Sequence, residues 1–258
     1  MRQNKVFARI YFWWKDSCEF KKELSYQNSG ESIAVLKTIL AIAAFSDFHS
    51  RESTISFSVL EDVTGLSRPM VSQAIAWLES KEWIRVSRNK GKRNSYYLVD
   101  KNEKYELKGW TKIPYLQIEE CLKKLPNKGK KALTAIKNYI LILFQRDNKV
   151  DFSIISHQKL ADYGGALPAL IKGGNDLLLS CNLIGYALYV NYDGNLITSK
   201  NFYHIKGLYY GKRGQVQQYA DHIDYVQANY EFSNRPKPRI IHTKNGTELI
   251  HVTKDLPF

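Results

Sequence analysis

The side chains best suited to chemistry lie between residues 68 and 93, and they suit contacts with nucleic acid better than covalent catalysis. Four of them lie on the side of an expected helix that faces away from its apolar residues: Arg68, Met70, Ser72 and Gln73. Glutamine can make paired hydrogen bonds to adenine, arginine can reach guanine or a phosphate, and methionine can touch a thymine methyl group. Four cations follow within six residues, with no acid between them: Arg88, Lys90, Lys92 and Arg93. Such a group is suited to phosphates.

The residues around this stretch predict two helices in succession. Ser58 and Glu61 have the spacing of a capping box, so the first helix is expected to begin at Ser58. Gly65 is expected to end it, because helices often terminate at a residue that tolerates a positive φ. Ser67 is expected to cap the second helix, and Pro69 fits its first turn, where no amide donor is needed.

The second helix, expected over residues 67–81, is amphipathic and leads into a hairpin. Its apolar residues recur at helical spacing, namely Val71, Ala74, Ile75 and Leu78. Residues 83–86 and 96–98 have the pattern of two strands, with the basic group at the tip between them. This order predicts a winged helix, whose second helix enters the major groove while the hairpin tip lies along the DNA backbone. Some winged helices bind only protein, and that alternative stays open.

A weak internal repeat relates two parts of the chain, about 99 residues apart. A mostly apolar helix is expected at residues 33–45 and again at 132–144, and short strands follow at 54–57 and 152–155. A second hairpin is expected over residues 186–205. The landmarks that keep their order are Ser58 with Ser156, Gly65 with Gly164 or Gly165, and Pro69 with Pro168. The repeat predicts a second winged helix.

The second copy departs from the first in its expected recognition helix, residues 167–180. Gly173 and Gly174 lie inside that helix, where each glycine costs about 1 kcal/mol relative to alanine. The helix is therefore expected to be broken or kinked, or else to let another backbone approach closely. Lys172 and Asn175 are its candidate groove residues.

The repeat sets the expected domain organisation and fold class. The fold class is α+β, with two tandem winged-helix domains and a small C-terminal extension of a helix and a β-hairpin. The expected boundaries are 1–100 for the first domain, 101–127 for a linker, 128–207 for the second domain and 208–258 for the basic extension. Within the extension, residues 216–230 are expected to be helical, and Asn245-Gly246 marks a hairpin turn. The aromatic residues of 7–14 are expected to complete a core, with a subunit contact as the alternative.

Composition narrows the functional classes. The 258 residues include 38 Lys and Arg against 25 Asp and Glu, a net charge of +13 that favours a polyanionic partner. Cys18, Cys121 and Cys181 have no metal or redox spacing, which is typical of reduced thiols in a cytoplasmic protein. The N-terminus lacks a signal-peptide pattern, and no apolar run is long enough to span a bilayer, so no membrane association is expected.

A second group of cations precedes the expected helix at 132–144. It consists of Lys123, Lys124, Lys128, Lys130 and Lys131. Cations at a helix N-terminus oppose the macrodipole, so this placement favours a role in holding phosphates.

Enzyme motifs are not found: the sequence has no Walker loop, no H-E-x-x-H and no G-x-S-x-G. The chain is therefore expected to be non-enzymatic, with no cofactor and no metal.

Two resemblances follow from these features. The segment from Leu66 to Ile84 resembles the recognition helix of MarR-like regulators, which indicates the fold more than the biology. The layout of residues 30–207 resembles that of plasmid replication-initiator proteins, which bind repeated origin sites. In those initiators the second winged helix usually dominates DNA contact, whereas in this sequence the first has the better set of reading residues.

The leading hypothesis is a sequence-specific binder of double-stranded DNA, either a transcriptional regulator or a plasmid or phage replication initiator. Its expected contacts are the helix over 67–81, the wing over 88–94 and the lysines Lys128, Lys130, Lys131 and Lys172. A homodimer or an assembly induced by the DNA site is expected. The alternative is a winged-helix module that binds protein within a partition or conjugation complex.

Overall fold

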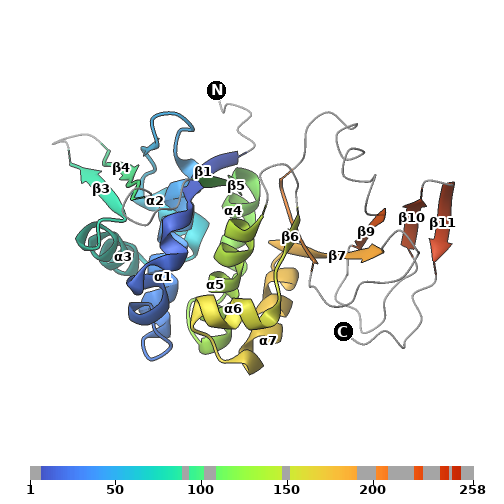
Figure 1. The fold of residues 1–258 in the computed structure, drawn as a ribbon. Coiled ribbons are helices and arrows are strands. Elements are labelled where there is room, and N and C mark those ends of the chain that lie inside the picture. The colour runs from blue at the N-terminus through green and yellow to red at the C-terminus, as the bar shows by residue number, and fades with distance from the viewer. Residues whose placement is uncertain are drawn as a thin grey trace.

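The computed structural model describes residues 7–88, 93–101, 109–146, 152–190, 202–208, 224–228, 239–243 and 246–250 (Figure 1). They form a mixed α/β fold, with the helices in the middle and small antiparallel sheets at the edges (Figure 1). Two groups of helices lie side by side, and β1 and β5 pair with each other above them (Figure 1).

The first copy of the repeat begins after a strand and an N-terminal arm, which we define as residues 12–28. The elements up to the start of the copy are β1 (Phe7–Tyr11), the 3-10 helix η1 (Phe12–Asp16) and the π-helix η2 (Glu19–Glu23). The copy itself consists of α1 (Ser29–Phe45), β2 (Glu52–Ser53), α2 (Phe57–Thr64), α3 (Arg68–Ser80), β3 (Ile84–Ser87) and β4 (Ser95–Leu98). Its three strands form an antiparallel sheet in the order β2-β4-β3.

The second copy has the same plan and is also preceded by a strand and an arm. The strand is β5 (Trp110–Pro114), and the central arm, residues 115–129, holds α4 (Tyr115–Cys121) and the 3-10 helix η3 (Leu122–Lys124). The copy consists of α5 (Lys130–Gln145), β6 (Phe152–Ile154), α6 (His157–Gly164), α7 (Pro168–Ser180), β7 (Ile184–Val190) and β8 (Phe202–Ile205). Three of its strands run in the order β6-β8-β7, which repeats the order of the first copy.

The offset between the copies is 100 residues through these helices, one more than the sequence comparison indicates. Ser56 caps α2 by accepting a hydrogen bond from the Val59 amide, and Ser156 caps α6 in the same way. Gly65 and Gly165 end these helices in the left-handed conformation that a glycine adopts without steric cost.

The predicted cap of the first helix was two residues out of place. The helix begins at Phe57 rather than Ser58, and Ser56 supplies the cap. Glu61 does not close a capping box; it forms an ion pair with Arg68 instead. The strand expected at 54–57 is likewise earlier, at Glu52–Ser53. Ser67 does precede α3 as predicted, but its side chain makes no capping hydrogen bond.

The glycine pair does not break the helix predicted over residues 167–180. Helix α7 is continuous over 13 residues and lies directly against α5. A Cβ atom on Gly174 would lie 2.9 Å from Thr134 Cγ2 and 3.0 Å from the Ala135 backbone nitrogen. Of the alternatives that the sequence leaves open, close approach of two backbones is therefore the correct one.

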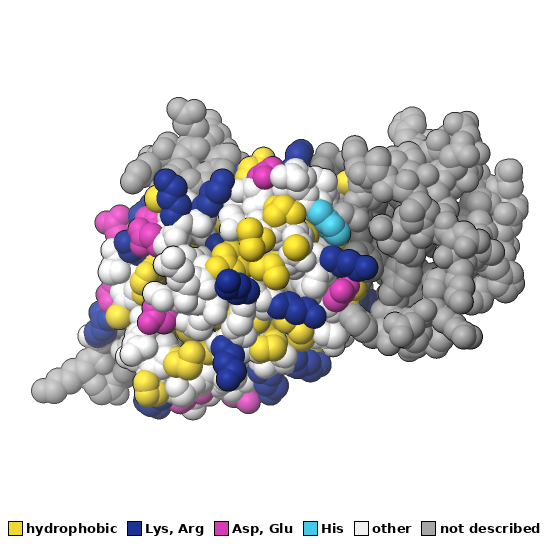
Figure 2. Space-filling model, turned by 90° about the horizontal axis from the view of Figure 1, so that it is seen from below, with side chains coloured by type: hydrophobic (Ala, Val, Ile, Leu, Met, Phe, Trp, Pro, Cys, Tyr) yellow, Lys and Arg dark blue, Asp and Glu magenta, His cyan; other side chains and the backbone are white. Residues whose placement is uncertain are grey.

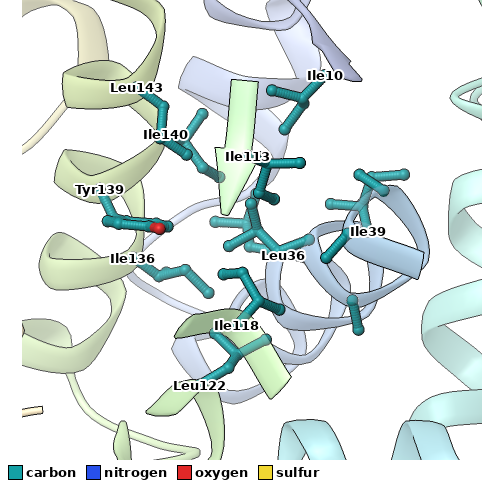
Figure 3. Packing of buried hydrophobic residues seen from close by; sticks show 14 of the residues in the cluster. Ile10, Leu36, Ile39, Ile113, Ile118, Leu122, Ile136, Tyr139, Ile140 and Leu143 are labelled. Carbon is teal, nitrogen blue, oxygen red and sulfur yellow. The ribbon is translucent and has the colours of Figure 1, made fainter. Parts of the chain in front are cut away.

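The stretch expected to be a linker takes part in the core. Strand β5 pairs with β1 in antiparallel register, with Arg9 opposite Lys112. Ile113, Ile118 and Leu122 are buried between α1 and α5 (Figure 3). The same core receives Ile10 and Leu36 from the first part of the chain and Ile136, Tyr139, Ile140 and Leu143 from α5 (Figure 3). These contacts join the two copies through apolar packing.

The two arms are exchanged between the copies. The N-terminal arm packs on the second copy, where the Lys21 carbonyl would lie 3.0 Å from a Cβ atom on Gly165. The central arm packs on the first copy, where Lys123 takes the equivalent position beside Gly65, 3.4 Å from such an atom. Each copy is therefore completed by a segment that precedes the other.

The N-terminal aromatic residues complete the core, as the sequence predicts. Trp13 and Trp14 are buried, and Trp14 stacks on Trp83 with a centroid distance of 4.9 Å. Trp14 also contacts Phe144 of the second copy edge to face, at 6.2 Å. This cluster is a further link between the copies.

The C-terminal extension differs in part from its prediction. Residues 224–228, expected to be helical, form β9, which pairs antiparallel with β7. The hairpin expected around Asn245-Gly246 is present as β10 (Arg239–Thr243) and β11 (Gly246–Ile250). The remainder of 208–258 apart from Leu208 lies outside the described residues. In the part of the chain that the structure describes, no helix has the length and apolar character needed to cross a bilayer.

Candidate nucleic-acid interface

Helix α3 is anchored by one face and leaves the other open. Val71, Ala74, Ile75 and Leu78 are all buried, at 4% exposure or less, against α1 and the hairpin. Four buried contacts on one stripe fix the rotation of the helix about its axis. The residues on the opposite side are therefore held in a defined direction, which is what a reading surface requires.

The predicted reading residues occupy this open side, although not equally. Ser72 and Gln73 are exposed, as are Pro69 and Ala76 beside them. Met70 is only half-exposed, because its side chain packs against the core. Gln73 thus keeps its amide available for hydrogen bonds, whereas Met70 offers less surface than its position in the sequence suggests.

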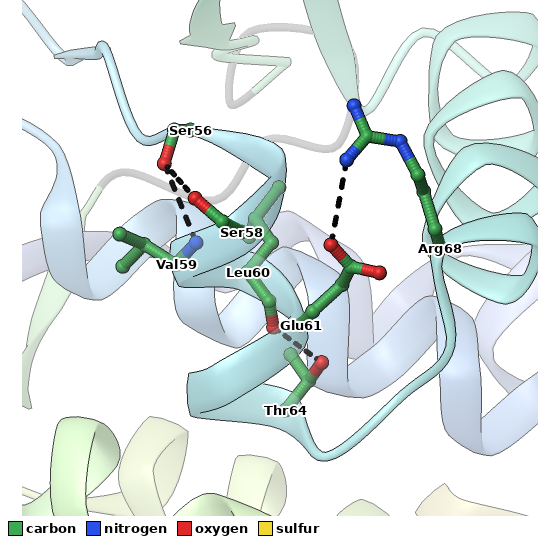
Figure 4. A network of polar contacts seen from close by, with 7 residues as sticks. All are labelled: Ser56, Ser58, Val59, Leu60, Glu61, Thr64 and Arg68. Atoms are coloured by element: carbon green, nitrogen blue, oxygen red, sulfur yellow. Dashed lines mark hydrogen bonds and ion pairs between the residues drawn. The ribbon is translucent and has the colours of Figure 1, made fainter.

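Arg68 lies at the start of α3 and is held by two weak contacts. Its guanidinium Nη1 is 3.6 Å from Glu61 Oε2, and the guanidinium carbon is 5.0 Å from the centre of the Phe57 ring. The side chain is still 66% exposed. Figure 4 shows Arg68 and Glu61 turned toward each other across the turn between α2 and α3. Exposed ion pairs of this kind contribute at most about 1 kcal/mol, so Arg68 can exchange Glu61 for another partner.

The cations of the wing are not equivalent. The two terminal nitrogens of Arg88, Nη1 and Nη2, donate hydrogen bonds to the Glu79 carboxylate, at 2.8 and 2.5 Å. These bonds join the end of β3 to α3. These hydrogen bonds lower the pKa of the Glu79 carboxyl and raise the pKa of Arg88. Arg93 is exposed, and Lys90 and Lys92 lie outside the described residues. Arg88 therefore ties the end of β3 to α3, although the sequence suggests only a phosphate contact for it.

The second group of predicted cations gathers at the start of α5 and beside α7. Lys128, Lys130 and Lys131 are exposed, and no acidic residue lies in the first turn of α5. The Lys131 side chain lies over Gly173, since a Cβ atom there would be 3.2 Å from Lys131 Cε. Lys172, the neighbour of Gly173, is also exposed. The structure thus brings a lysine of α5 next to α7.

The lower face of the molecule combines cations with apolar side chains. Helices α6 and α7 lie low in Figure 1, and Figure 2 shows this side from below. Lys and Arg side chains lie across the face beside a central group of hydrophobic side chains (Figure 2). Leu167, at the cap of α7, is 64% exposed. In α3 the equivalent position is Ser67, so the tip of α7 is the more apolar of the two.

Asn175 is not a groove residue, contrary to its prediction. It is fully buried, and its side chain bonds to Asn138 at 2.8 Å and to the Tyr203 hydroxyl at 3.0 Å. The Asn175 amide also lies 3.4 Å from His157 Nε2, and burial lowers the pKa of His157. Ile75 holds the equivalent position in α3, so the second copy has a polar network where the first has apolar packing.

One set of cations was missed by the sequence reasoning. Lys15, Lys21 and Lys22, from the N-terminal arm, line a cavity against α6 together with Tyr163. The Lys21-Lys22 pair is visible in the sequence, but its place beside the second copy follows only from the exchange of arms. Nothing in the local pattern of residues 12–28 indicates that exchange.

The remaining sites for chemistry are limited in the described part of the chain. No group of three or more His, Cys, Asp or Glu side chains is close enough there to hold a metal ion. Cys18 is exposed, Cys121 and Cys181 are buried, and all three are free thiols. Comparison of the chain with family models, with curated proteins and with solved structures gives no match.

Proposed function

We propose that the chain is a sequence-specific binder of double-stranded DNA built from two tandem winged-helix units. The observation that carries the proposal is the open side of α3, where Arg68, Ser72 and Gln73 are exposed on a helix fixed by four buried residues. The order of helices and strands in both copies and the net charge of +13 support it. A transcriptional regulator and a plasmid or phage replication initiator both use such a surface.

In this proposal the first copy reads the bases. Helix α3 enters the major groove, Gln73 makes paired hydrogen bonds to an adenine, and Arg68 leaves Glu61 for a guanine or a phosphate. A well-formed pair of this kind discriminates between bases by about 1–3 kcal/mol. The wing, held to α3 by Arg88 and Glu79, brings Arg93 and its neighbours to the backbone.

The second copy contributes mainly positive charge. Lys128, Lys130, Lys131 and Lys172 are exposed at the start of α5 and on α7, where they suit backbone phosphates. In the same region the outward side of α7 has no equivalent of Gln73, because Gly173 holds that position. We therefore assign base recognition to α3 and phosphate contacts to these four lysines.

The test separates base reading from backbone binding. Duplexes selected from a random pool should bind the full chain far more tightly than random DNA, and log affinity should fall linearly with log salt. The variant R68A/Q73A should lose the preference for the selected duplex while keeping its affinity for random DNA. Ser80→Ala, at the other end of the same helix, is the matched control. Full preference retained in R68A/Q73A would refute the assignment of α3.

A second candidate function is a protein-interaction module, and the central group of hydrophobic side chains on the lower face favours it (Figure 2). An exposed apolar patch is a natural contact for another protein, including a second copy of this chain, and Leu167, which is 64% exposed at the tip of α7, adds apolar surface. If another protein co-purifies with the chain in a stoichiometric amount, and the chain is not retained on heparin, this candidate is supported over DNA binding. The mass of the chain with and without the selected duplex tests the homodimer or DNA-induced assembly that we expect for the DNA-binding form.

A further inference from the structure

A cavity lies between the N-terminal arm and helix α6, apart from the surfaces assigned to DNA. Its volume is about 370 Å³, within the range of pockets for small ligands. Three lysines line it, Lys15, Lys21 and Lys22, together with Cys18, Asp162 and Tyr163. Cationic groups thus outnumber acidic ones by three to one in this lining.

We propose that this cavity binds the phosphate of a nucleotide, with the base against the Tyr163 ring. The Lys15 ammonium is 5.4 Å from the centre of that ring, so a cation and an aromatic surface are present at one end of the cavity. Tyr163 is 37% exposed, which leaves part of its ring available for stacking. A base stacked on an aromatic side chain and a phosphate held by lysines is a common way to bind nucleotides without reading their sequence.

The first copy provides an internal comparison, because the equivalent lysine there forms an ion pair. Lys123 occupies the position of Lys21, and its ammonium pairs with Asp62 at 3.3 Å. In the second copy Asp162 instead accepts a hydrogen bond from Gln158, at 2.9 Å. Among the described residues no ion pair involves Lys21 or Lys22, so their charge is not neutralised as that of Lys123 is.

The aromatic wall is also specific to the second copy. Tyr163 corresponds to Val63, which is buried in the core of the first copy. Within the described parts of the two copies, a partly exposed tyrosine, a carboxylate turned toward Gln158, and Lys21 and Lys22 without an ion pair therefore occur together only in the second. This difference is what an added ligand site requires.

The phosphate has two possible sources with the same chemistry, a free nucleotide and a nucleotide within a DNA strand. The inference goes beyond the proposed function, because binding of a free nucleotide needs no contact by α3.

Cys18 provides a local readout: it lines the cavity and is exposed, whereas Cys121 and Cys181 are buried. A bound ligand should therefore slow alkylation of Cys18 by iodoacetamide.

The experiment measures Cys18 alkylation in the full chain by peptide mass spectrometry, with AMP or pyrophosphate as the probe. AMP should protect Cys18 in a saturable manner. The variant K21A/K22A should weaken that protection by about tenfold or more, because charge-assisted phosphate contacts are lost. R85A/K159A removes two exposed cations outside the cavity and is the matched control. Tyr163→Ala should weaken the effect of AMP and leave that of pyrophosphate unchanged.

The DNA arm of the experiment distinguishes the two sources. A single-stranded oligonucleotide that protects Cys18 where AMP does not, with K21A/K22A weakened more than R85A/K159A, supports a phosphate within a strand. If AMP protects Cys18 in a chain that binds no duplex, the cavity site stands and the proposed function fails. If AMP, pyrophosphate and the single strand all leave the alkylation rate unchanged, or if R85A/K159A loses protection as K21A/K22A does, the inference is overturned.

Discussion

Lys37 and Lys137 show at the scale of single residues how the repeat is built. The Lys37 ammonium donates to the Thr64 carbonyl at 2.8 Å, and the Lys137 ammonium donates to the Gly164 carbonyl at 2.9 Å. The two lysines therefore place a cation at the C-terminus of α2 and of α6, where the macrodipole favours it. Lys37 also bonds to the Leu125 carbonyl and to the Asn127 side chain, each at 2.6 Å, and so ties the central arm to the first copy.

The buried lysines should make stability depend on pH in the alkaline range. Burial lowers the pKa of Lys37 and of Lys137 to about 8, below the 10.5 of a free lysine. Between these values the folded chain binds fewer protons than the unfolded chain, so stability rises with pH. Between pH 7 and 9 the gain should be about 1 kcal/mol for each lysine.

Urea unfolding at several pH values measures this gain. The wild-type chain is compared with K37M/K137M, so that contributions from titrating groups that do not interact with these two lysines, such as the Lys112 ammonium, cancel. The difference in unfolding free energy should move in favour of the wild type as the pH rises. A difference independent of pH would show that both lysines titrate normally in the folded chain.

Glu61 should hold Arg68 back from DNA. The ion pair between them is exposed and worth at most about 1 kcal/mol, so its removal should tighten binding of the selected duplex by up to about fivefold. Glu61→Gln tests this by fluorescence anisotropy at fixed salt. Glu82→Gln removes the same charge from a residue paired with Lys101 and should have a smaller effect. Equal effects of the two changes would mean that only net charge matters.

At the scale of elements, helix ends and helix contacts explain where each copy differs from its sequence pattern. The capping-box pattern at Ser58 is present, but Ser56 is placed so that its hydroxyl reaches the Val59 amide at 3.3 Å. The glycine pair of α7 has a packing role, because α7 and α5 approach more closely at Gly174 than a larger residue allows. Both outcomes depend on the path of the backbone and not on residue type alone.

Removal of the cap should distinguish Ser56 from Ser58. Ser56→Ala should lower the unfolding free energy by about 1 kcal/mol, because the amide of Val59 then loses its partner. Ser58→Ala should have little effect, since the Ser58 hydroxyl bonds only to that of Ser56 among the described contacts. The comparison uses urea unfolding of the two variants side by side. A larger loss for Ser58→Ala would restore the original assignment of the cap.

The two glycines of α7 should respond in opposite ways to alanine. Gly174→Ala places a Cβ atom against the Thr134 and Ala135 backbone and should cost about 1–3 kcal/mol through overpacking. Gly173→Ala meets only the flexible Lys131 side chain, and the gain in helix propensity of up to about 1 kcal/mol should make it neutral or stabilising. Thermal unfolding of both variants tests the contrast, which disappears if α7 does not pack on α5.

At the scale of the whole molecule, the two copies are packed against each other through shared contacts. They share the apolar core between α1 and α5, the β1–β5 pairing and the exchanged arms. Removal of either copy would expose this core and leave the arms without their partners. The division into domains at residues 100 and 128 stays a prediction, and it describes the repeat better than it describes the packing.

We therefore expect a single unfolding transition for the full chain. Tryptophan fluorescence reports mainly on the cluster of Trp13, Trp14 and Trp83, and far-ultraviolet circular dichroism reports on all helices. The two probes should give the same urea midpoint, because cooperative unfolding has no populated intermediate. The fragment 1–100 should be unstable alone, since it lacks β5, α4 and α5. Two separate transitions, or a stably folded fragment, would contradict this.

Much of the local structure follows from the sequence, because it rests on short-range spacing. The buried stripe of α3, the glycine at the end of each first helix and the hairpin strands are confirmed at or near their predicted residues. The exposure of Arg68, Ser72 and Gln73 follows from that stripe, since helical periodicity places them opposite it. The assignment of these residues to DNA stays a prediction.

Only the tertiary structure decided which segments complete each copy. The stretch expected to be a linker supplies a strand and a helix to the core. Asn175 is buried in a polar network. Three lysines, Lys15, Lys21 and Lys22, lie beside α6, which is more than 130 residues away in the sequence. Periodicity records which side of an element is apolar but not what covers that side. The covering segments here come from distant parts of the chain, so long-range packing settles these positions.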